Sequence, residues 1–229
     1  MKNGVNKTIS AFASIMLLIL LIFTAIHFLG LNKGLYGVLQ RKFDVADEIG
    51  ISQNDLDSVT EVFIDYTKVN RDNLDVAVSL DGQQVEMFNE REKLHMIDVK
   101  ALYDKMIKIC FVLAALTALI LIYLLIRKQK ETIYRMHKKV SIGFLFFCAA
   151  LGVYFVIDFN SFWTNIHLLL FTNDLWLLNP MTDRMIIMFP LNFFLALSVI
   201  VLTVFIVIFA LLFIWSNKGL KRIEKRESA

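Results

Sequence analysis

Hydrophobic residues along the 229-residue chain are concentrated in four long blocks, separated by polar segments. The blocks cover residues 9–29, 107–126, 140–157 and 186–215. A helix needs about 20 apolar residues to cross a bilayer, so the pattern predicts four transmembrane helices. The first block is longer than a signal-peptide core and no small-x-small cleavage site follows it, which favours an uncleaved span. The fold class expected is a mainly α-helical integral membrane protein.

The polar segments between the blocks define the expected domain organisation. It consists of residues 1–30 (N-terminal tail and first span), 31–106 (a small cap), 107–126 (second span), 127–139 (a basic loop), 140–157 (third span), 158–185 (an interfacial segment), 186–215 (fourth span) and 216–229 (a basic tail).

The cap contains two local patterns. Residues 52–68 read as a helix capped by Ser52, with Leu56, Val59 and Phe63 on one face. Two short extended runs flank Asp81-Gly82, a dipeptide typical of a tight hairpin turn. The cap is therefore expected to be α-helical with one β-hairpin, and too small to be an independent domain.

A further helix is predicted over residues 89–105, and it leads into the second span. Asn89 can cap it, and Glu92 stands three residues later, where it can complete a capping box. One apolar face is expected from residues at helical spacing: Leu94, Ile97, Ala101 and Leu102.

Residues 158–185 are too apolar for a solvated loop and too interrupted for a span. Trp163, Phe171 and Trp176 suit the level of the lipid headgroups. A short helix through Phe171, capped by Asn160 or Ser161, is predicted to lie in the interface or to re-enter the membrane.

The distribution of basic residues predicts the orientation. Lys and Arg number two before the first span, six in 127–139 and five in 216–229, but one in 158–185. The positive-inside rule then places both termini in the cytoplasm and makes the cap and the 158–185 segment face outward together. His137 falls in the basic 127–139 run and is expected in a solvated loop.

Composition excludes several classes of function. The chain is 57% hydrophobic with a mean hydropathy of +0.61, and no basic patch with interleaved aromatic residues indicates nucleic-acid binding. Cys110 and Cys148 lie in different apolar blocks, so neither reads as half of a disulfide or as part of a zinc cluster. No glycine-rich phosphate loop is present, and no cofactor is predicted.

Histidines beside the membrane are the candidates for chemistry. His95 and Asp98 are three residues apart on the predicted 89–105 helix, where a carboxylate can orient an imidazole. That spacing alone is more typical of a solvated helix. His167 lies in the other outward segment, near Asn165, Asn173 and Asp174. The two segments together predict acid–base chemistry by His95 and His167, with these four polar residues in support.

Two other readings of the histidines remain open. His27, near the outer end of the first span, is either interfacial or pocket-lining. A metal site of His95, Asp98 and His167 is a minor alternative, because no metal-binding spacing occurs in the chain.

Two segments resemble a known family. F-N-E-R-E-K-L-H-M-I-D-V-K at 88–100, and S-F-W-T-N-I-H-L-L-L-F-T-N-D-L-W from residue 161 through M-F-P ending at Pro190, are similar to bacterial lipoprotein intramolecular transacylases. These are four-span membrane proteins of Gram-positive bacteria. The resemblance implies transfer of the sn-2 acyl chain of a diacylglyceryl-cysteine lipoprotein to the α-amine of the same cysteine, giving a lyso-form lipoprotein. It also implies that His95 and His167 are catalytic and that diacylglyceryl lipoproteins and membrane lipids are the partners.

That reaction fits the residues, since amine and ester belong to one molecule and no Ser or Cys nucleophile is needed. Candidate donors to the oxyanion are Asn165, Asn173 and backbone N–H groups of the helix near Ser161. A second class of function stays open: a membrane sensor or accessory subunit whose cap binds a partner. A cavity shared by the two imidazoles would discriminate between the two classes.

Overall fold

The computed structural model describes residues 2–228; Met1 and Ala229, at the ends of the predicted terminal segments, lie outside the described residues. The chain divides into two compact units. The first, called here the helical unit, comprises Met1–Ala25, Lys108–Ile157 and Leu202–Ala229. The second, the site unit, comprises Ile26–Ile107 and Asp158–Val201.

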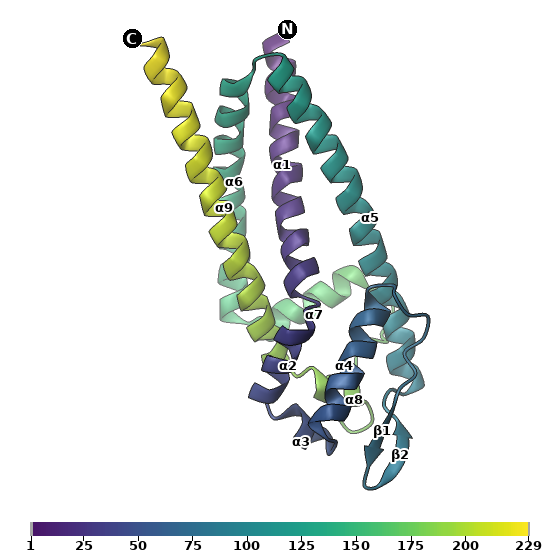
Figure 1. Ribbon diagram of the computed structural model, residues 1–229. Helices are drawn as coiled ribbons and strands as arrows, with labels where there is room; N and C mark the ends of the chain where they lie inside the picture. Colours follow the sequence, from purple (N-terminus) through teal and green to yellow (C-terminus); the bar gives the residue numbers. More distant parts are fainter. Residues whose placement is uncertain (1, 229) are drawn as a thin grey trace. The chain divides into compact units, whose positions relative to one another are not determined.

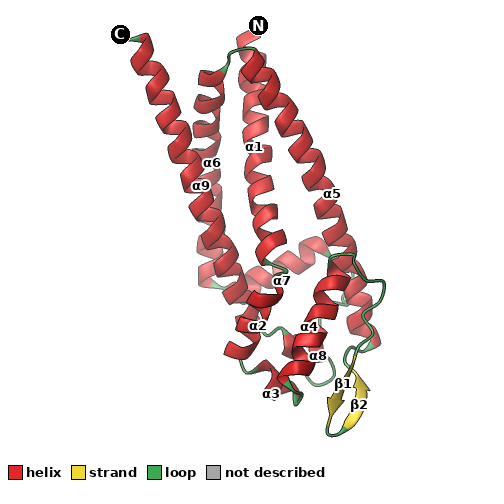
Figure 2. Ribbon diagram, viewed as in Figure 1, coloured by secondary structure: helices red, strands yellow, loops and turns green. Residues whose placement is uncertain are grey.

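The elements follow one another in the order shown in Figure 1: α1 (Lys2–Leu29), α2 (Lys33–Lys42), α3 (Val45–Ile49), α4 (Gln53–Thr67), β1 (Ala77–Leu80), β2 (Gln83–Glu86), α5 (Glu90–Ile126), α6 (Lys130–Ile157), α7 (Phe159–Leu170), α8 (Arg184–Met188) and α9 (Leu191–Glu227). Within residues 2–228 the strands form one antiparallel pair (Figure 2). The predicted class, helical with one hairpin, is confirmed.

Four helices of the described chain are long and apolar enough to cross a membrane: Gly4–Leu29, Glu90–Ile126, Lys130–Ile157 and Leu191–Arg226. This confirms the four predicted spans. Large apolar side chains remain exposed on them, such as Phe111 at 73% and Val156 at 79%, as expected where lipid replaces water. In the helical unit, α6 packs on α9 through Phe144, which lies 6.0 Å from Phe205 and 6.2 Å from Phe209 between ring centroids.

The predicted basic loop 127–139 is mostly helix, so its boundary was wrong. Only residues 127–129 separate α5 from α6, and the first helical turns of α6 are held by Arg135, which contacts Glu131 at 2.6 Å and Glu224 of α9 at 3.6 Å. His137 is accordingly buried rather than solvated. The predicted tail is also helical, because α9 continues to Glu227.

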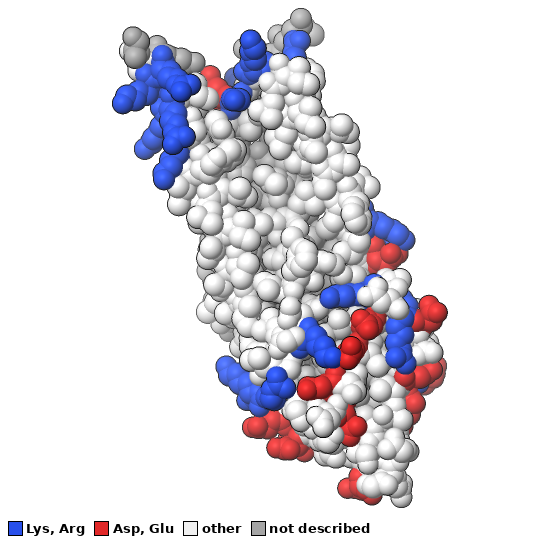
Figure 3. Space-filling view, in the orientation of Figure 1, with Lys and Arg blue, Asp and Glu red and all other residues white. Residues whose placement is uncertain are grey.

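Both α1 and α9 have their terminal ends at the same end of the helical unit (Figure 1). Lys and Arg side chains gather there, whereas the surface of the site unit mixes both signs of charge (Figure 3). A basic end is the pattern that the positive-inside rule associates with the cytoplasm.

The local patterns of the cap formed as predicted. Ser52 caps α4, accepting a hydrogen bond from the backbone N–H of Asp55 at 3.0 Å. Leu56 and Val59 are fully buried on its inner face. The hairpin pairs Leu80 with Gln83, and Asp81 and Gly82 have φ values of 51° and 78°, which a two-residue primed turn requires.

Three short helices, α2, α3 and α8, were not predicted, and the inward face of α5 differs from the prediction. Leu94 and Ile97, on the predicted apolar face, are 41% and 54% exposed, whereas Glu92, His95 and Met96 are buried. The reason is tertiary: the face of α5 that is covered is the one that meets α7 and α8, whatever its polarity.

The core of the site unit joins the cap to the segment before α9. Phe189, just before α9, packs on Tyr36 of α2 and Phe63 of α4 with ring centroids 5.6 and 4.6 Å apart, and Phe193, in the first turn of α9, lies 5.0 Å from Tyr36. The cap therefore completes its core with residues more than 100 positions away, in agreement with the small size that argued against an independent cap.

Candidate active site

The N-terminus of α5 positions His95. Asn89 and Glu92 form the predicted capping box, in which the Asn89 backbone N–H donates to Glu92 Oε2 at 2.7 Å and the Glu92 N–H donates to Asn89 Oδ1 at 3.0 Å. The other oxygen of Glu92 accepts from the Met185 backbone N–H of α8. These contacts anchor the first turn of α5, and His95 follows one turn later with 8% of its surface exposed.

His167 is placed by α7, whose cap is Asp158 and not the predicted Asn160 or Ser161. The Asp158 carboxylate accepts a hydrogen bond from the Ser161 N–H at 2.9 Å. Nδ1 of His167 lies 2.8 Å from the Trp163 carbonyl oxygen one turn earlier. A carbonyl only accepts, so the proton is assigned to Nδ1 and Nε2 keeps its lone pair.

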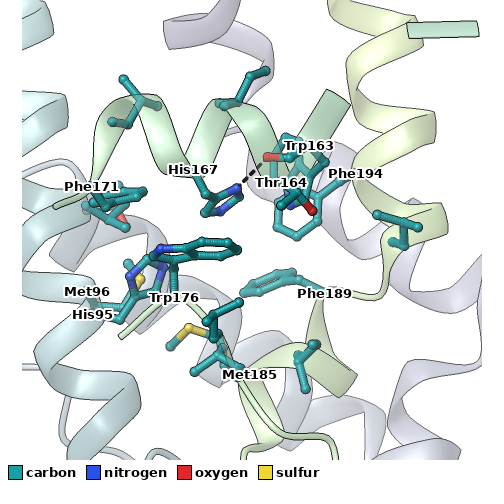
Figure 4. Close-up of a pocket in the computed structure, with 18 of the residues that line it drawn as sticks. His95, Met96, Trp163, Thr164, His167, Phe171, Trp176, Met185, Phe189 and Phe194 are labelled. Atoms are coloured by element: carbon teal, nitrogen blue, oxygen red, sulfur yellow. Dashed lines mark hydrogen bonds between the residues drawn. The ribbon is translucent and has the colours of Figure 1, made fainter. Parts of the chain in front are cut away.

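The two imidazoles meet although 72 positions separate them in the chain. Their ring centroids are 6.5 Å apart. Phe171 packs edge-on to His95 at 5.2 Å, and Trp176 lies 5.0 Å from His167 (Figure 4). The prediction that the two outward segments bring these histidines together is therefore matched by the geometry.

A cavity of about 470 Å³ opens beside the pair, within the size range of small-ligand sites. His95 and His167 both line it. The rest of the lining is largely apolar and aromatic and includes Tyr36, Phe63, Val99, Trp163, Met185, Phe189 and Phe194, with Asn160 and Thr164 as polar contributors. Figure 4 shows the rings of Trp163, Phe171, Trp176, Phe189 and Phe194 around the two histidines. Such a lining suits an acyl chain.

Both histidines favour the neutral form. α5 has 37 residues, about 55 Å, and its Asp and Glu residues all precede residue 105, so His95 lies outside the apolar span 107–126. Burial lowers the pKa of His95 to about 4; a positive charge on His167 adds to this effect whenever that ring is protonated, and the negative charge of Asp98 opposes it. Burial also lowers the pKa of His167, against the opposing effect of its bond to Trp163. At neutral pH both imidazoles are proton acceptors.

Nδ1 of His95 is buried and finds no hydrogen-bond partner among residues 2–228. A buried polar atom of this kind costs free energy unless something pairs with it. Because His95 lines the cavity, a bound molecule with an N–H or carbonyl group can satisfy it.

The predicted supporting residues have other partners. Asp98 does not orient His95 through a hydrogen bond; its Oδ2 accepts from the Asn173 amide at 2.8 Å. Asp174 is exposed and faces Arg91, with 3.7 Å between their charged atoms. Asn165 is exposed on α7 and is not among the described residues that line the cavity. The polar lining residues of α7 are Asn160 and Thr164 instead.

Several contributors were missed from the sequence. The carbonyl of Trp163 sets the tautomer of His167, and the spacing of four residues on one helix was the available signal. Nothing local indicated that Tyr36 and Phe63 of the cap reach the cavity. His27, left open between two readings, bonds through Nδ1 to the Tyr103 hydroxyl at 2.6 Å.

No group of three or more His, Cys, Asp or Glu side chains in the described part of the chain is arranged to hold a metal ion. His95 and His167 both line the cavity.

Known proteins provide a direct comparison. The family model for the lipoprotein intramolecular transacylase Lit matches residues 11–194. A search of curated proteins finds no match. Among solved structures, the lipoprotein intramolecular transacylase Lit from Bacillus cereus aligns with a TM-score of 0.81 and 21% identity, covering 97% of this chain and 99% of that chain.

Two variants of the Bacillus cereus protein also align, one with a histidine replaced by alanine and one with it replaced by arginine. Each has a TM-score of 0.76, with 20% and 21% identity; they cover 98% and 100% of this chain, and 97% and 96% of theirs. These likenesses show the four-span fold. The family match, which extends over most of the chain, does not favour a sensor or accessory subunit, and it establishes that the chain belongs to the lipoprotein intramolecular transacylase family, an acyltransferase family.

Proposed function

We propose that the chain moves the sn-2 acyl chain of a diacylglyceryl-cysteine lipoprotein to the α-amine of the same cysteine, using His95 and His167 as proton carriers. One observation carries the proposal: two imidazoles, 6.5 Å apart, line one apolar cavity of about 470 Å³. The family supplies the class of reaction, and the cavity supports an acyl chain as the group moved.

Bonds and protons balance without an acyl-enzyme. The amine nitrogen attacks the ester carbonyl and forms the amide C–N bond, the ester C–O bond breaks, and one proton passes from nitrogen to the glyceryl oxygen. The net change is an exchange of ester for amide plus an alcohol. Attack closes a medium-sized ring through the thioether, so holding the folded conformer is a large part of the work.

His167 is the better-defined base. Its Nδ1–H is occupied by the Trp163 carbonyl, which leaves Nε2 free to accept the proton that the attacking amine releases. The imidazolium then returns this proton to the departing glyceryl oxygen.

His95 completes the site. Its unpartnered Nδ1 can bond the substrate, and as a neutral neighbour it does not repel the imidazolium that forms on His167. Two charged imidazoles at this distance would repel each other in an apolar surrounding, so at most one ring of the pair is protonated to imidazolium at a time.

Asn160 and Thr164 of α7, which line the cavity, are the proposed side-chain hydrogen-bond donors to the tetrahedral oxyanion, in place of Asn165.

The site is proposed to face outward, with both termini in the cytoplasm, because basic residues gather at the terminal end of the helical unit. Diacylglyceryl lipoproteins would then reach the cavity from the outer leaflet.

The test is mass spectrometry of a defined diacylglyceryl lipopeptide incubated with the purified protein. The expected product has the same mass as the substrate but carries one chain as an amide on the α-amine, which fragmentation and ester hydrolysis distinguish. A lipopeptide with its amine already acylated serves as control and should stay unchanged. An acyl adduct accumulating on a Ser, Thr or Cys of the protein would refute direct transfer.

A further inference from the structure

We propose that Asp98 and Asn173 are positioning residues: the hydrogen bond between them holds residues 171–178, called here the strap, against the two imidazoles. This inference rests on the proposed function, because it assigns the strap a part in the same reaction. Asp98 was expected to orient His95, and Asn173 was expected to support the site as a candidate donor to the oxyanion; in the structure the two side chains bond to each other.

Asn173 organises the strap internally. Its side-chain oxygen accepts from the Leu175 N–H at 3.1 Å, and its backbone carbonyl accepts from the Trp176 indole N–H at 3.0 Å. The remaining donor, the amide nitrogen of the side chain, goes to Asp98. One residue therefore shapes the turn, aims the indole and attaches the strap to α5.

The strap is attached on both sides of His95. Asp98 stands three residues after His95 on α5, and Arg91 stands four residues before it. The Arg91 guanidinium donates to the Asp174 carbonyl and lies 3.7 Å from the Asp174 carboxylate. Both attachments are exposed, and the Arg91–Asp174 ion pair at 3.7 Å contributes little. The bond between Asp98 and Asn173 is charge-assisted, has defined geometry, and joins α5 to the residue that organises the strap.

The attachments determine what covers the histidines. Phe171, at the start of the strap, packs on His95 at 5.2 Å, and Trp176 packs on His167 at 5.0 Å. Leu177 and Leu178 continue into the cavity lining. With the strap in place the imidazoles are shielded from water, and His167 keeps the orientation in which Nε2 is available. Release of the strap exposes His167 and loosens its ring.

The experiment reverses the polarity of the hydrogen bond. N173D keeps the acceptor for the Leu175 N–H but sets a second carboxylate against Asp98. D98N keeps an acceptor for the Asn173 amide. The double variant D98N/N173D restores the bond, with the amide at position 98 now donating to the carboxylate at position 173. E90Q, a carboxylate-to-amide change at an exposed position of the same helix, is the matched control.

Two quantities are measured on the full-length protein: acyl transfer to the lipopeptide, and the rate at which diethyl pyrocarbonate modifies His167 without substrate. We expect N173D to lower kcat/KM by about fivefold or more, since one hydrogen bond of roughly 1 kcal/mol is lost, and to speed the modification of His167. D98N alone should change either by less than about twofold, and the double variant should return both towards wild type. E90Q/N173D should behave like N173D.

The proposal is overturned if N173D leaves both the transfer rate and the modification rate unchanged. It is also overturned if the double variant D98N/N173D does not return these rates towards wild type while thermal unfolding shows that the variants are folded. Failure of the proposed function looks different. A wild-type protein that does not transfer the acyl chain would refute the reaction, while the modification rates of His167 would still decide whether Asp98 and Asn173 hold the strap.

Discussion

Glu92 is the side chain whose removal should most disturb the arrangement of the site. It has no exposed surface and accepts two backbone hydrogen bonds, from Asn89 in the capping box and from Met185 of α8, 93 residues away. Met185 lines the cavity. Replacing Glu92 by alanine therefore uncaps α5 and at the same time detaches a wall of the site.

The size of the effect follows from the two donors left behind. An unsatisfied buried polar group costs about 1–3 kcal/mol. The Met185 N–H is buried and the Asn89 N–H is half-buried, so Glu92→Ala should cost roughly 2–4 kcal/mol. For a chain of this size that corresponds to a Tm lower by roughly 5–15 °C. Glu92→Gln keeps one acceptor oxygen and should lose about half as much.

The pH dependence provides a second measure. Burial raises the pKa of Glu92, against its two backbone hydrogen bonds. Because the pKa is raised in the folded state, the carboxyl group stabilises the fold most below its ordinary pKa of 4.5. This contribution to folding stability declines as the pH rises through the pKa of Glu92 in the folded protein. The difference in Tm between wild type and Glu92→Gln should therefore shrink from pH 4.5 to pH 8.

The assay is thermal unfolding of the purified protein in detergent, with Glu90→Ala as control. Glu90 is exposed on the same turn of α5, and its loss should change Tm by no more than about 2 °C, as surface substitutions usually do. If Glu92→Ala unfolds at the same temperature as Glu90→Ala, the buried network does not hold α5 to α8 and the reasoning fails.

The remaining predictions concern the site and the topology. His95→Ala and His167→Ala should each lower acyl transfer by about 10²–10⁴-fold, the usual contribution of a general acid–base group, in protein that unfolds at the wild-type temperature; measurable transfer at more than a tenth of the wild-type rate would contradict the roles assigned. Cys110→Ala and Cys148→Ala should change the same rate by less than about twofold, because neither cysteine lines the cavity as far as the described residues show. NMR of ¹⁵N-histidine should show His95 gaining its proton near pH 4, so that it is neutral at pH 6, and a midpoint above pH 6 would contradict the burial argument. In a cysteine-free background, a cysteine replacing exposed Ser79 should react with an impermeant reagent added outside cells and one replacing Ser228 should not; the reverse result would invert the topology.

Local patterns in the sequence determined much of the fold. Apolar blocks of about 20 residues predicted four spans, because a bilayer of fixed thickness demands that length. Ser52 and Asn89 predicted helix starts, and Asp81-Gly82 predicted the hairpin, because capping and turn geometry depend on residues within four positions of each other. The 127–139 boundary was missed because a run of basic residues reads as a loop, although long charged side chains are tolerated where a helix leaves the membrane.

The candidate site divides in the same way. The sequence singled out His95 and His167 because interfacial ionisable residues are functional candidates and both fell on the outward side. Their separation, the tautomer of His167 and the cavity depended on segments far apart in the chain. Tyr36 and Phe63 reach the site only because the core of the cap is completed by the segment before α9.

Asp98 shows why spacing alone was insufficient. Three residues after His95 on a helix, it is near enough to act on the imidazole electrostatically, yet its carboxylate bonds Asn173 on the strap, 75 residues later. Likewise Leu94 and Ile97 had the helical spacing of a buried face, and α7 and α8 covered the opposite one. Periodicity and capping are encoded over a few residues and can be read from the chain. Which face is buried, and which partner a polar group finds, is decided by what packs against it, and only the tertiary structure determines that.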